Sequence, residues 1–239
     1  MPELPEVETV RRGLENRSVG FHIRKVEVLK ERSIASPGGS KEFISKMQGV
    51  KIKSWSRRGK YLIASLEKDV IRNNKLSCNN STPYGWWGVH LRMTGQFQWH
   101  KEKKKICPHT RVRFWNPQGH ELRFIDTRNF GQMWWVPAER SLPEIISGLK
   151  KLGPEPFSED FTTFYLIKKL KGKKSSIKSA LLDQSIFAGT GNIYADESLF
   201  SAGIVPTKES WKLDESQIDN LRQSLINVLK ISIGKGGTT

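Results

Sequence analysis

Three residues at the start of the chain have types and a spacing that could perform covalent chemistry. Loss of Met1 leaves Pro2 with a secondary α-amine, and because such amines have a pKa of about 8, roughly a tenth is unprotonated at pH 7. Attack of this amine on a sugar C1′ would give a cationic iminium ion, which is covalent catalysis of the Schiff-base type. Glu3 and Glu6 lie three residues apart, on one face of a predicted helix, and could divide acid and base roles. The alternative is that both glutamates only stabilise the helix start through its dipole.

Basic residues gather in two segments that could bind phosphate. Lys60 ends the sequence Arg-Arg-Gly-Lys at residues 57–60, directly before a predicted strand. Six lysines fall within eleven residues and lead toward a glycine turn at residues 189–191 that opens a helix; they are Lys168, Lys169, Lys171, Lys173, Lys174 and Lys178. Free backbone N–H groups at such a helix start bind phosphate well. The alternatives are a solvated lysine face and a plain helix–helix turn with Asn192 as its N-cap.

The histidines and cysteines do not predict a metal site. The candidates are four of the five histidines and both cysteines: His90, His100, His109, His120, Cys78 and Cys107. Only the pair Cys107 and His109 is close in sequence, and two cysteines cannot form a four-cysteine zinc site. Met93 precedes Thr94 and Gly95 at a predicted turn tip, where a methionine can wedge into a base stack. The alternative for Met93, as for Phe130, is a place in the core.

Length and charge limit the classes of protein that these residues can belong to. The chain has 239 residues, enough for one large or two modest domains, and its 40 basic against 24 acidic residues give a formal charge of +16. This excess predicts a polyanionic partner, most often nucleic acid. No apolar run is long enough for a membrane span, and the acidic, amphipathic start is not a signal peptide. With two cysteines, we expect a cytoplasmic protein, and nothing indicates an oligomer, so we expect a monomer.

Hydrophobic spacing predicts helix first and then many strands. Residues 2–15 favour a helix, because Pro2 and Pro5 are tolerated only in a first turn, and Gly20 follows it. Period-two alternation predicts strands, with a tight turn at residues 116–119; the segments are 21–28, 52–55, 61–66, 89–93, 112–114 and 122–124. The Asn-rich segment 73–83 favours a surface loop.

The pattern changes near Pro137, and helices follow. Residues 142–152, 161–170, 176–184, 192–202 and 214–233 suit helices. The predicted fold is therefore a multidomain α+β fold. It combines an antiparallel β-sandwich domain carrying the first helix (1–137), a linker (138–153) and an all-helical domain (154–239).

Several of these segments together resemble the formamidopyrimidine-DNA glycosylase family of bacterial enzymes that excise oxidised purines. The resemblance rests on PELPEVETVRRGL, SRRGKYL, HLRMTG, DTRNFG, LGPEPF, AGTGNIYADESLFSAGI and KGGTT, and it spans nearly the whole chain. PELPE is similar to the purine-directed branch, whereas the branch resembling endonuclease VIII begins PEGPE. The family implies a helix–two-turn–helix motif in the helical domain and double-stranded DNA with oxidised purines or abasic sites as partner.

The resemblance also implies residue roles. Pro2 would be the nucleophile, Glu3 the acid that assists sugar ring opening, and Glu6 and Lys60 catalytic residues beside them, Lys60 at a phosphate. Cleavage by β- and δ-elimination would follow base removal. The DNA-contacting residues would comprise a wedge of Met93, Arg128 and Phe130 that fills the gap left by the flipped base, with Arg128 facing the orphaned cytosine, and His109, Lys178, Asn192 and Tyr194 around it.

Three features depart from the family pattern. Family members usually continue past KGGTT into a four-cysteine finger that binds one structural zinc; this sequence holds no such finger, so we expect no cofactor in the chain and either a truncated product or a natural variant. The segment 67–88 is longer than usual, and Asn129 stands where a basic residue is common. Two other functions therefore stay open: a non-catalytic remnant that binds damaged DNA, and an RNA-binding module.

Overall fold

The computed structural model describes residues 1–72 and 75–237. Its contacts divide the chain into two compact units. The first unit holds residues 1–2, 10–57 and 61–147, and the second holds residues 3–9, 58–60 and 148 onward. The second unit thus takes in the first turns of the amino-terminal helix and the short segment that carries Lys60. The expected multidomain α+β fold is confirmed.

The amino-terminal helix α1 runs over Leu4–Ser18 and contributes to both units. Pro5 lies in its first turn, where a missing N–H costs nothing. Leu4 and Val7 are fully buried, and the Ser18 hydroxyl donates to the Leu14 carbonyl at 2.7 Å near the helix end. Gly20, with a φ of +80°, then turns the chain. The helix begins two residues later and ends three residues later than the spacing predicted.

The first unit is built from two four-stranded sheets, as expected for a β-sandwich. One sheet has the order β1-β6-β7-β5 and the other the order β2-β3-β4-β8. The strands are β1 (Lys25–Val28), β2 (Lys51–Arg58), β3 (Tyr61–Arg72), β4 (Lys75–His90), β5 (Gly95–His100), β6 (Thr110–Trp115), β7 (Glu121–Asp126) and β8 (Gln132–Pro137). The pairs β1–β6, β3–β4, β4–β8, β5–β7 and β6–β7 are antiparallel.

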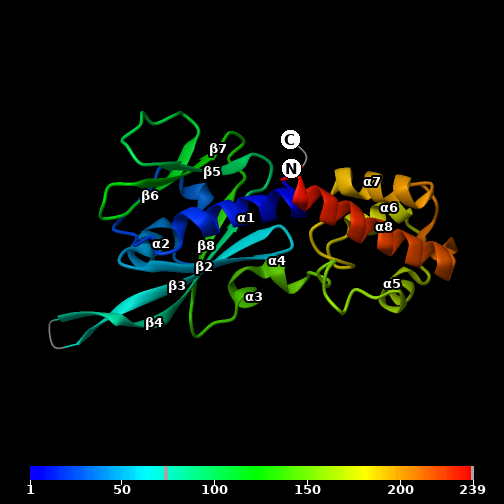
Figure 1. The fold of residues 1–239 in the computed structure, drawn as a ribbon, viewed down its shortest axis with the longest axis horizontal. Coiled ribbons are helices and arrows are strands. Elements are labelled where there is room, and N and C mark those ends of the chain that lie inside the picture. Colours follow the sequence, from blue (N-terminus) through cyan, green and yellow to red (C-terminus); the bar gives the residue numbers. More distant parts are fainter. Residues whose placement is uncertain (73–74, 238–239) are drawn as a thin grey trace. The chain divides into compact units, whose positions relative to one another are not determined.

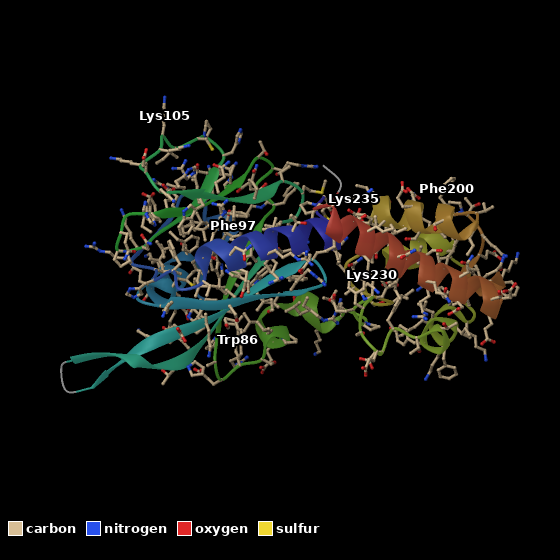
Figure 2. The ribbon with its side chains drawn as sticks, viewed as in Figure 1. Trp86, Phe97, Lys105, Phe200, Lys230 and Lys235 are labelled. Carbon is tan, nitrogen blue, oxygen red and sulfur yellow. The ribbon has the colours of Figure 1, made fainter. Side chains whose placement is uncertain are left out.

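Aromatic rings join the two sheets. Trp87 of β4 is fully buried and lies 4.5 Å from Phe114 of β6 and 5.8 Å from Phe97 of β5, measured between ring centroids. Figure 2 shows Phe97 among the side chains of this core, whereas Lys105 extends from the loop after β5. The predicted β6–β7 turn is confirmed, because Phe114 faces Leu122 across the hairpin. The alternating apolar residues of the sequence therefore form the core between the sheets.

The structure departs from the sequence prediction at four places between residues 31 and 150. Residues 75–83 are not a loop: β3 and β4 continue pairing to Arg72 and Lys75, and Figure 1 shows their hairpin extending beyond the rest of the sheet. Backbone hydrogen bonds hold such strands whatever their side chains, so alternation did not reveal them; residues 73 and 74 lie outside the described residues. The spacing also missed the helix α2 (Gly39–Met47) and a 3-10 turn, η1 (Glu31–Ser33). The helix predicted over 142–152 is two short helices, α3 (Leu142–Ile145) and α4 (Ser147–Lys150), because Ile146 leaves helical geometry.

The second unit is helical, as predicted. Its main helices, which Figure 1 shows in yellow to red, are α5 (Thr163–Leu170), α6 (Ile177–Leu182), α7 (Asn192–Ala202) and α8 (Glu215–Gly234), with a 3-10 turn, η2 (Ser210–Lys212), before α8. Side chains of Thr162, Ser176 and Asp214 accept from the first-turn N–H groups of α5, α6 and α8. The core around Phe187, Tyr194 and Leu225 holds the helices together.

Candidate active site at the amino terminus

The carboxylate of Glu3 occupies the start of helix α7. It accepts hydrogen bonds from the backbone N–H groups of Gly191 at 2.7 Å, Ile193 at 3.1 Å and Tyr194 at 3.4 Å, and only 4% of the Glu3 side chain is exposed. The first N–H groups of a helix have no partner within it, and the dipole there favours negative charge. The chain's own carboxylate thus takes three of the N–H groups at this helix start, and binding of phosphate here stays a prediction. Gly191, rather than Asn192, is the N-cap.

Two glycines make room for this contact. The N–H of Leu4 donates to the carbonyl of Gly189 at 2.9 Å, so that the residues around Glu3 lie directly on the turn. A Cβ on Gly189 would come within 2.7 Å of the Leu4 side chain, and one on Gly191 within 2.4 Å of the Glu3 carboxyl group. Gly189 also has a φ of +103°, which L-residues rarely adopt. The Gly-Thr-Gly sequence is therefore required for Glu3 to reach the helix start.

Glu6 joins the same cluster through two hydrogen bonds. Its carboxylate accepts from the backbone N–H of Glu3 at 2.9 Å and from the Tyr194 hydroxyl at 2.6 Å. Tyr194 was expected to contact DNA, but its side chain is fully buried. In this structure the Tyr194 hydroxyl binds Glu6, and a contact of Tyr194 with DNA stays a prediction. The tyrosine instead fixes Glu6, which in turn holds the backbone beside Pro2.

Lys60 is the cation of this cluster. Only 7% of it is exposed, and burial lowers the pKa of its ammonium group, while the charges of Glu3 and Glu6 act in the opposite direction. Its neighbour Gly59 donates its N–H to the Glu155 carboxylate at 2.6 Å, and Arg58 forms an ion pair with the same carboxylate at 2.9 Å. A buried lysine with a lowered pKa beside two carboxylates is typical of active sites.

The first unit carries the residues predicted to form the wedge. Met93 and Phe130 are 37% and 39% exposed, unusually much for large apolar side chains, and Arg128 is exposed. The guanidinium of Arg128 lies 5.2 Å from the centre of the Phe130 ring, and that of Arg32 lies 5.6 Å from it. Such cation–π contacts hold a ring in place while its edge stays accessible. Met93 and Phe130 are therefore surface residues, and their alternative place in the core is ruled out.

A shallow cavity of about 380 Å³ lies beside this pair. It is lined by Met1, Arg32, Arg92, Met93, Phe130 and Gln132. Arg92 has a left-handed backbone with a φ of +54°, and it donates to Gln132 at 2.6 Å. Arg32, Arg92 and Gln132 were missed by sequence reasoning, because they stand outside the apolar pattern and outside the residues that the resemblance assigns.

Hydrogen bonds of Thr94 connect the loop that carries Met93 with the loop that carries Arg128 and Phe130. The Thr94 hydroxyl is hydrogen-bonded to Asp126, and it also accepts from the backbone N–H of Arg128 at 3.0 Å. Asn129 in this loop has a φ of +57°, a conformation that asparagine tolerates better than most residues. These contacts were not predicted, since they join residues about 32 positions apart.

Three further residues were predicted to contact DNA: His109, Asn192 and Lys178. His109 and Asn192 are exposed. Lys178 is partly exposed, and its ammonium group forms an ion pair with Asp196 at 2.8 Å, so a phosphate would have to compete with that carboxylate. Within residues 1–72 and 75–237, no three His, Cys, Asp or Glu side chains come together as metal ligands. Over the same described residues, no helix is both long and apolar enough to cross a membrane.

Comparison with known proteins gives one consistent result. The formamidopyrimidine-DNA glycosylase N-terminal domain matches residues 1–133, and the H2TH domain of the same family matches residues 152–239. A formamidopyrimidine-DNA glycosylase of Prochlorococcus marinus is 60% identical over 239 residues, which are the whole of this chain and 81% of that protein.

Solved structures of similar proteins agree. The Lactococcus lactis enzyme in complex with FAPY-dG-containing DNA is 35% identical with a TM-score of 0.86, covering 99% of this chain and 82% of its own. A MutM structure in complex with carbocyclic 8-oxo-G-containing DNA is 35% identical with a TM-score of 0.87, covering 100% of this chain and 83% of its own. The chain belongs to the formamidopyrimidine-DNA glycosylase family of base-excision-repair enzymes.

Proposed function

We propose that the protein removes oxidised purines, such as 8-oxoguanine and formamidopyrimidines, from double-stranded DNA and then cleaves the abasic strand. The observation that supports this proposal most strongly is the position of Glu3. Its buried carboxylate accepts hydrogen bonds from three backbone N–H groups, and it directly follows Pro2, whose amine would attack the sugar. Two similar solved structures are complexes with DNA that contains FAPY-dG and carbocyclic 8-oxo-G, which supports the same substrate class. With such a substrate, the protein acts in the bacterial cytoplasm.

In the proposed reaction, the free amine of Pro2 attacks C1′ of the damaged nucleotide. The bond between C1′ and the base breaks, and the base leaves with the bonding electrons and takes a proton from water. The Pro2 nitrogen gives its proton to the Glu3 carboxylate, which passes this proton on to O4′. The bond between C1′ and O4′ then breaks, and an iminium ion forms between C1′ and the Pro2 nitrogen. Loss of a C2′ proton then expels the 3′-phosphate, and δ-elimination expels the 5′-phosphate.

We assign the other residues as follows. Glu6 and Lys60 belong to the catalytic cluster, because both are held against Glu3 by hydrogen bonds or charge. Met93, Arg128 and Phe130 fill the gap left by the flipped nucleotide, since flipping costs a few kcal/mol that restacking partly recovers. His109, Lys178 and Asn192 contact phosphates.

The proposed domain roles follow the change in sequence pattern. Residues 1–137 form the catalytic β-sandwich domain, residues 138–153 the linker, and residues 154–239 the DNA-binding domain with the helix–two-turn–helix motif. The two family domains, which match residues 1–133 and 152–239, are compatible with this division.

Substitution of Glu3 tests the proposal. In Glu3→Gln, loss of the acid should lower the single-turnover rate of 8-oxoguanine excision by about 10²–10⁴-fold. Glu102→Gln, in an exposed position on the loop after β5, is the matched control and should leave the rate unchanged. Equal rates for Glu3→Gln and the wild type would refute the role of Glu3. A wild-type protein that binds an abasic duplex but never excises a base would instead favour the non-catalytic binding alternative.

A further inference from the structure

The side chain of Gln184 bridges the two ends of the Gly-Thr-Gly turn. Its carbonyl oxygen accepts the N–H of Gly189 at 2.9 Å, and its amide nitrogen donates to the carbonyl of Thr190 at 2.8 Å and to that of Leu182 at 3.1 Å. We propose that Gln184 is a positioning residue, which holds this turn in the shape that receives the Glu3 carboxylate. The proposal rests on the proposed role of Glu3 in catalysis.

The turn depends on Gln184 because few other hydrogen bonds hold it. The Gly189 carbonyl and the Gly191 N–H are used by Leu4 and Glu3, the residues to be positioned. Thr190 is fully buried, yet its hydroxyl has no hydrogen-bond partner among the described residues, so that side chain does not fix the turn. The Gly189 N–H and the Thr190 carbonyl both form their hydrogen bonds with the side-chain amide of Gln184. This side chain therefore takes the place of a backbone partner for the turn.

Gln184 is itself anchored through its backbone. Its carbonyl accepts the N–H of Gly153 at 2.9 Å, and the nearby N–H of Ala188 donates to Pro154 at 2.9 Å. Hydrogen bonds therefore connect the Gly153–Pro154 segment to Gln184, and Gln184 to the turn that binds Glu3. A group that must stay within about 0.5 Å of its productive position needs such a supporting layer.

The effect of removing this support can be estimated. In Gln184→Met the side chain keeps its length, but the buried Gly189 N–H and Thr190 carbonyl lose their partners and the turn moves to find others. A misplacement of about 1 Å at a catalytic group costs up to about 10²-fold in rate. We expect the excision rate to fall about 10- to 100-fold while the dissociation constant for DNA stays within about twofold, because Gln184 has no part in the proposed DNA contacts.

Amide hydrogen exchange, followed by NMR on the full chain, tests the inference without relying on catalysis. In Gln184→Met, the amides of Leu4 and Gly191 should exchange at least about tenfold faster than in the wild type. The control is Gln217→Met, which removes the hydrogen bonds that the Gln217 side chain accepts from the Asp214 N–H at the start of α8 and from the Lys208 ammonium group, but does not touch the turn. There the two amides should change no more than the other core amides do.

The outcomes separate the inference from the proposed function. Unchanged exchange of Leu4 and Gly191 in Gln184→Met overturns the inference, even if the enzyme is active. Faster exchange in a protein whose wild type excises no base supports the positioning role of Gln184 and overturns the proposed function. Faster exchange in Gln184→Met, together with a lower excision rate and unchanged DNA binding, supports both the inference and the proposed function. If Gln217→Met speeds the exchange of Leu4 and Gly191 equally, Gln184 is only a general stabilising residue and the inference is overturned.

Discussion

Replacement of Gly191 by alanine adds one methyl group directly against the Glu3 carboxylate. The new Cβ would lie 2.4 Å from both the carboxyl carbon and one oxygen of Glu3. Carbon atoms pack at about 3.5 Å, so either the carboxylate or the turn must move by about 1 Å. Gly191 has a φ of −132° and a ψ of −160°, which alanine adopts without strain, and the effect is therefore purely steric.

The expected loss follows from this displacement. A shift of about 1 Å in a catalytic group costs about 10²-fold, which is about 2.7 kcal/mol of transition-state stabilisation. Because the hydrogen bond from Gly191 to a buried carboxylate is lengthened or lost, the free energy of unfolding should also fall by about 1.5–3 kcal/mol.

Single-turnover excision of 8-oxoguanine from a duplex measures the rate, and thermal unfolding measures the stability. Gly234→Ala is the matched control, because no atom lies within 4 Å of its Cβ position in α8. That variant should excise at the wild-type rate and be as stable as the wild type or slightly more stable. A Gly191→Ala rate within threefold of the wild type would refute the view that the turn sets the position of Glu3.

Two further predictions concern buried polar groups. Burial alone would raise the pKa of Glu121, but hydrogen bonds from Arg123 and Arg113 lower it from 4.5 to about 2. The ionised Glu121 carboxylate therefore contributes about 3 kcal/mol to the free energy of unfolding above pH 4.5, and this contribution is lost as the pH falls toward 2. Acid unfolding of the wild type and Glu121→Gln should show a stability gap that closes below pH 4.5, and a gap independent of pH would contradict the assignment. Tyr194→Phe removes the hydroxyl bound to Glu6 and should cost about 1–3 kcal/mol in urea unfolding; an unchanged midpoint would show that this hydrogen bond contributes nothing.

Most of the fold could be predicted from the sequence because the apolar spacing is strong where side chains make the core. Helices α5 to α8 and the β6–β7 hairpin carry both periodic apolar residues and end signals. The parts that escaped prediction are held by other forces. The outer half of the β3–β4 hairpin pairs through its backbone. The short helix α2 has Gly38 as its N-cap and begins at Gly39, and neither glycine gives a helix signal.

The candidate site was predicted as a set of residues but not as an arrangement. The family resemblance named Glu3, Glu6 and Lys60, yet no local pattern shows that Glu3 binds a helix start 188 positions away. Two further features of the site depend on the same long-range contacts: Glu3 binds N–H groups at the start of α7, and Tyr194 is buried with its hydroxyl hydrogen-bonded to Glu6. Hydrogen bonds between distant segments follow from tertiary packing, which periodicity along one segment does not encode.

Borohydride trapping tests the central claim, the covalent role of Pro2, most directly. Protein whose mass confirms loss of Met1 is mixed with an 8-oxoguanine duplex and, in parallel, with an abasic-site duplex, each in the presence of borohydride. We expect a reduced covalent adduct on both duplexes, joined through Pro2 in the peptide map, and no adduct when the amino terminus is acetylated. An adduct that forms equally with acetylated protein, or that maps to a lysine, would contradict the proposed chemistry.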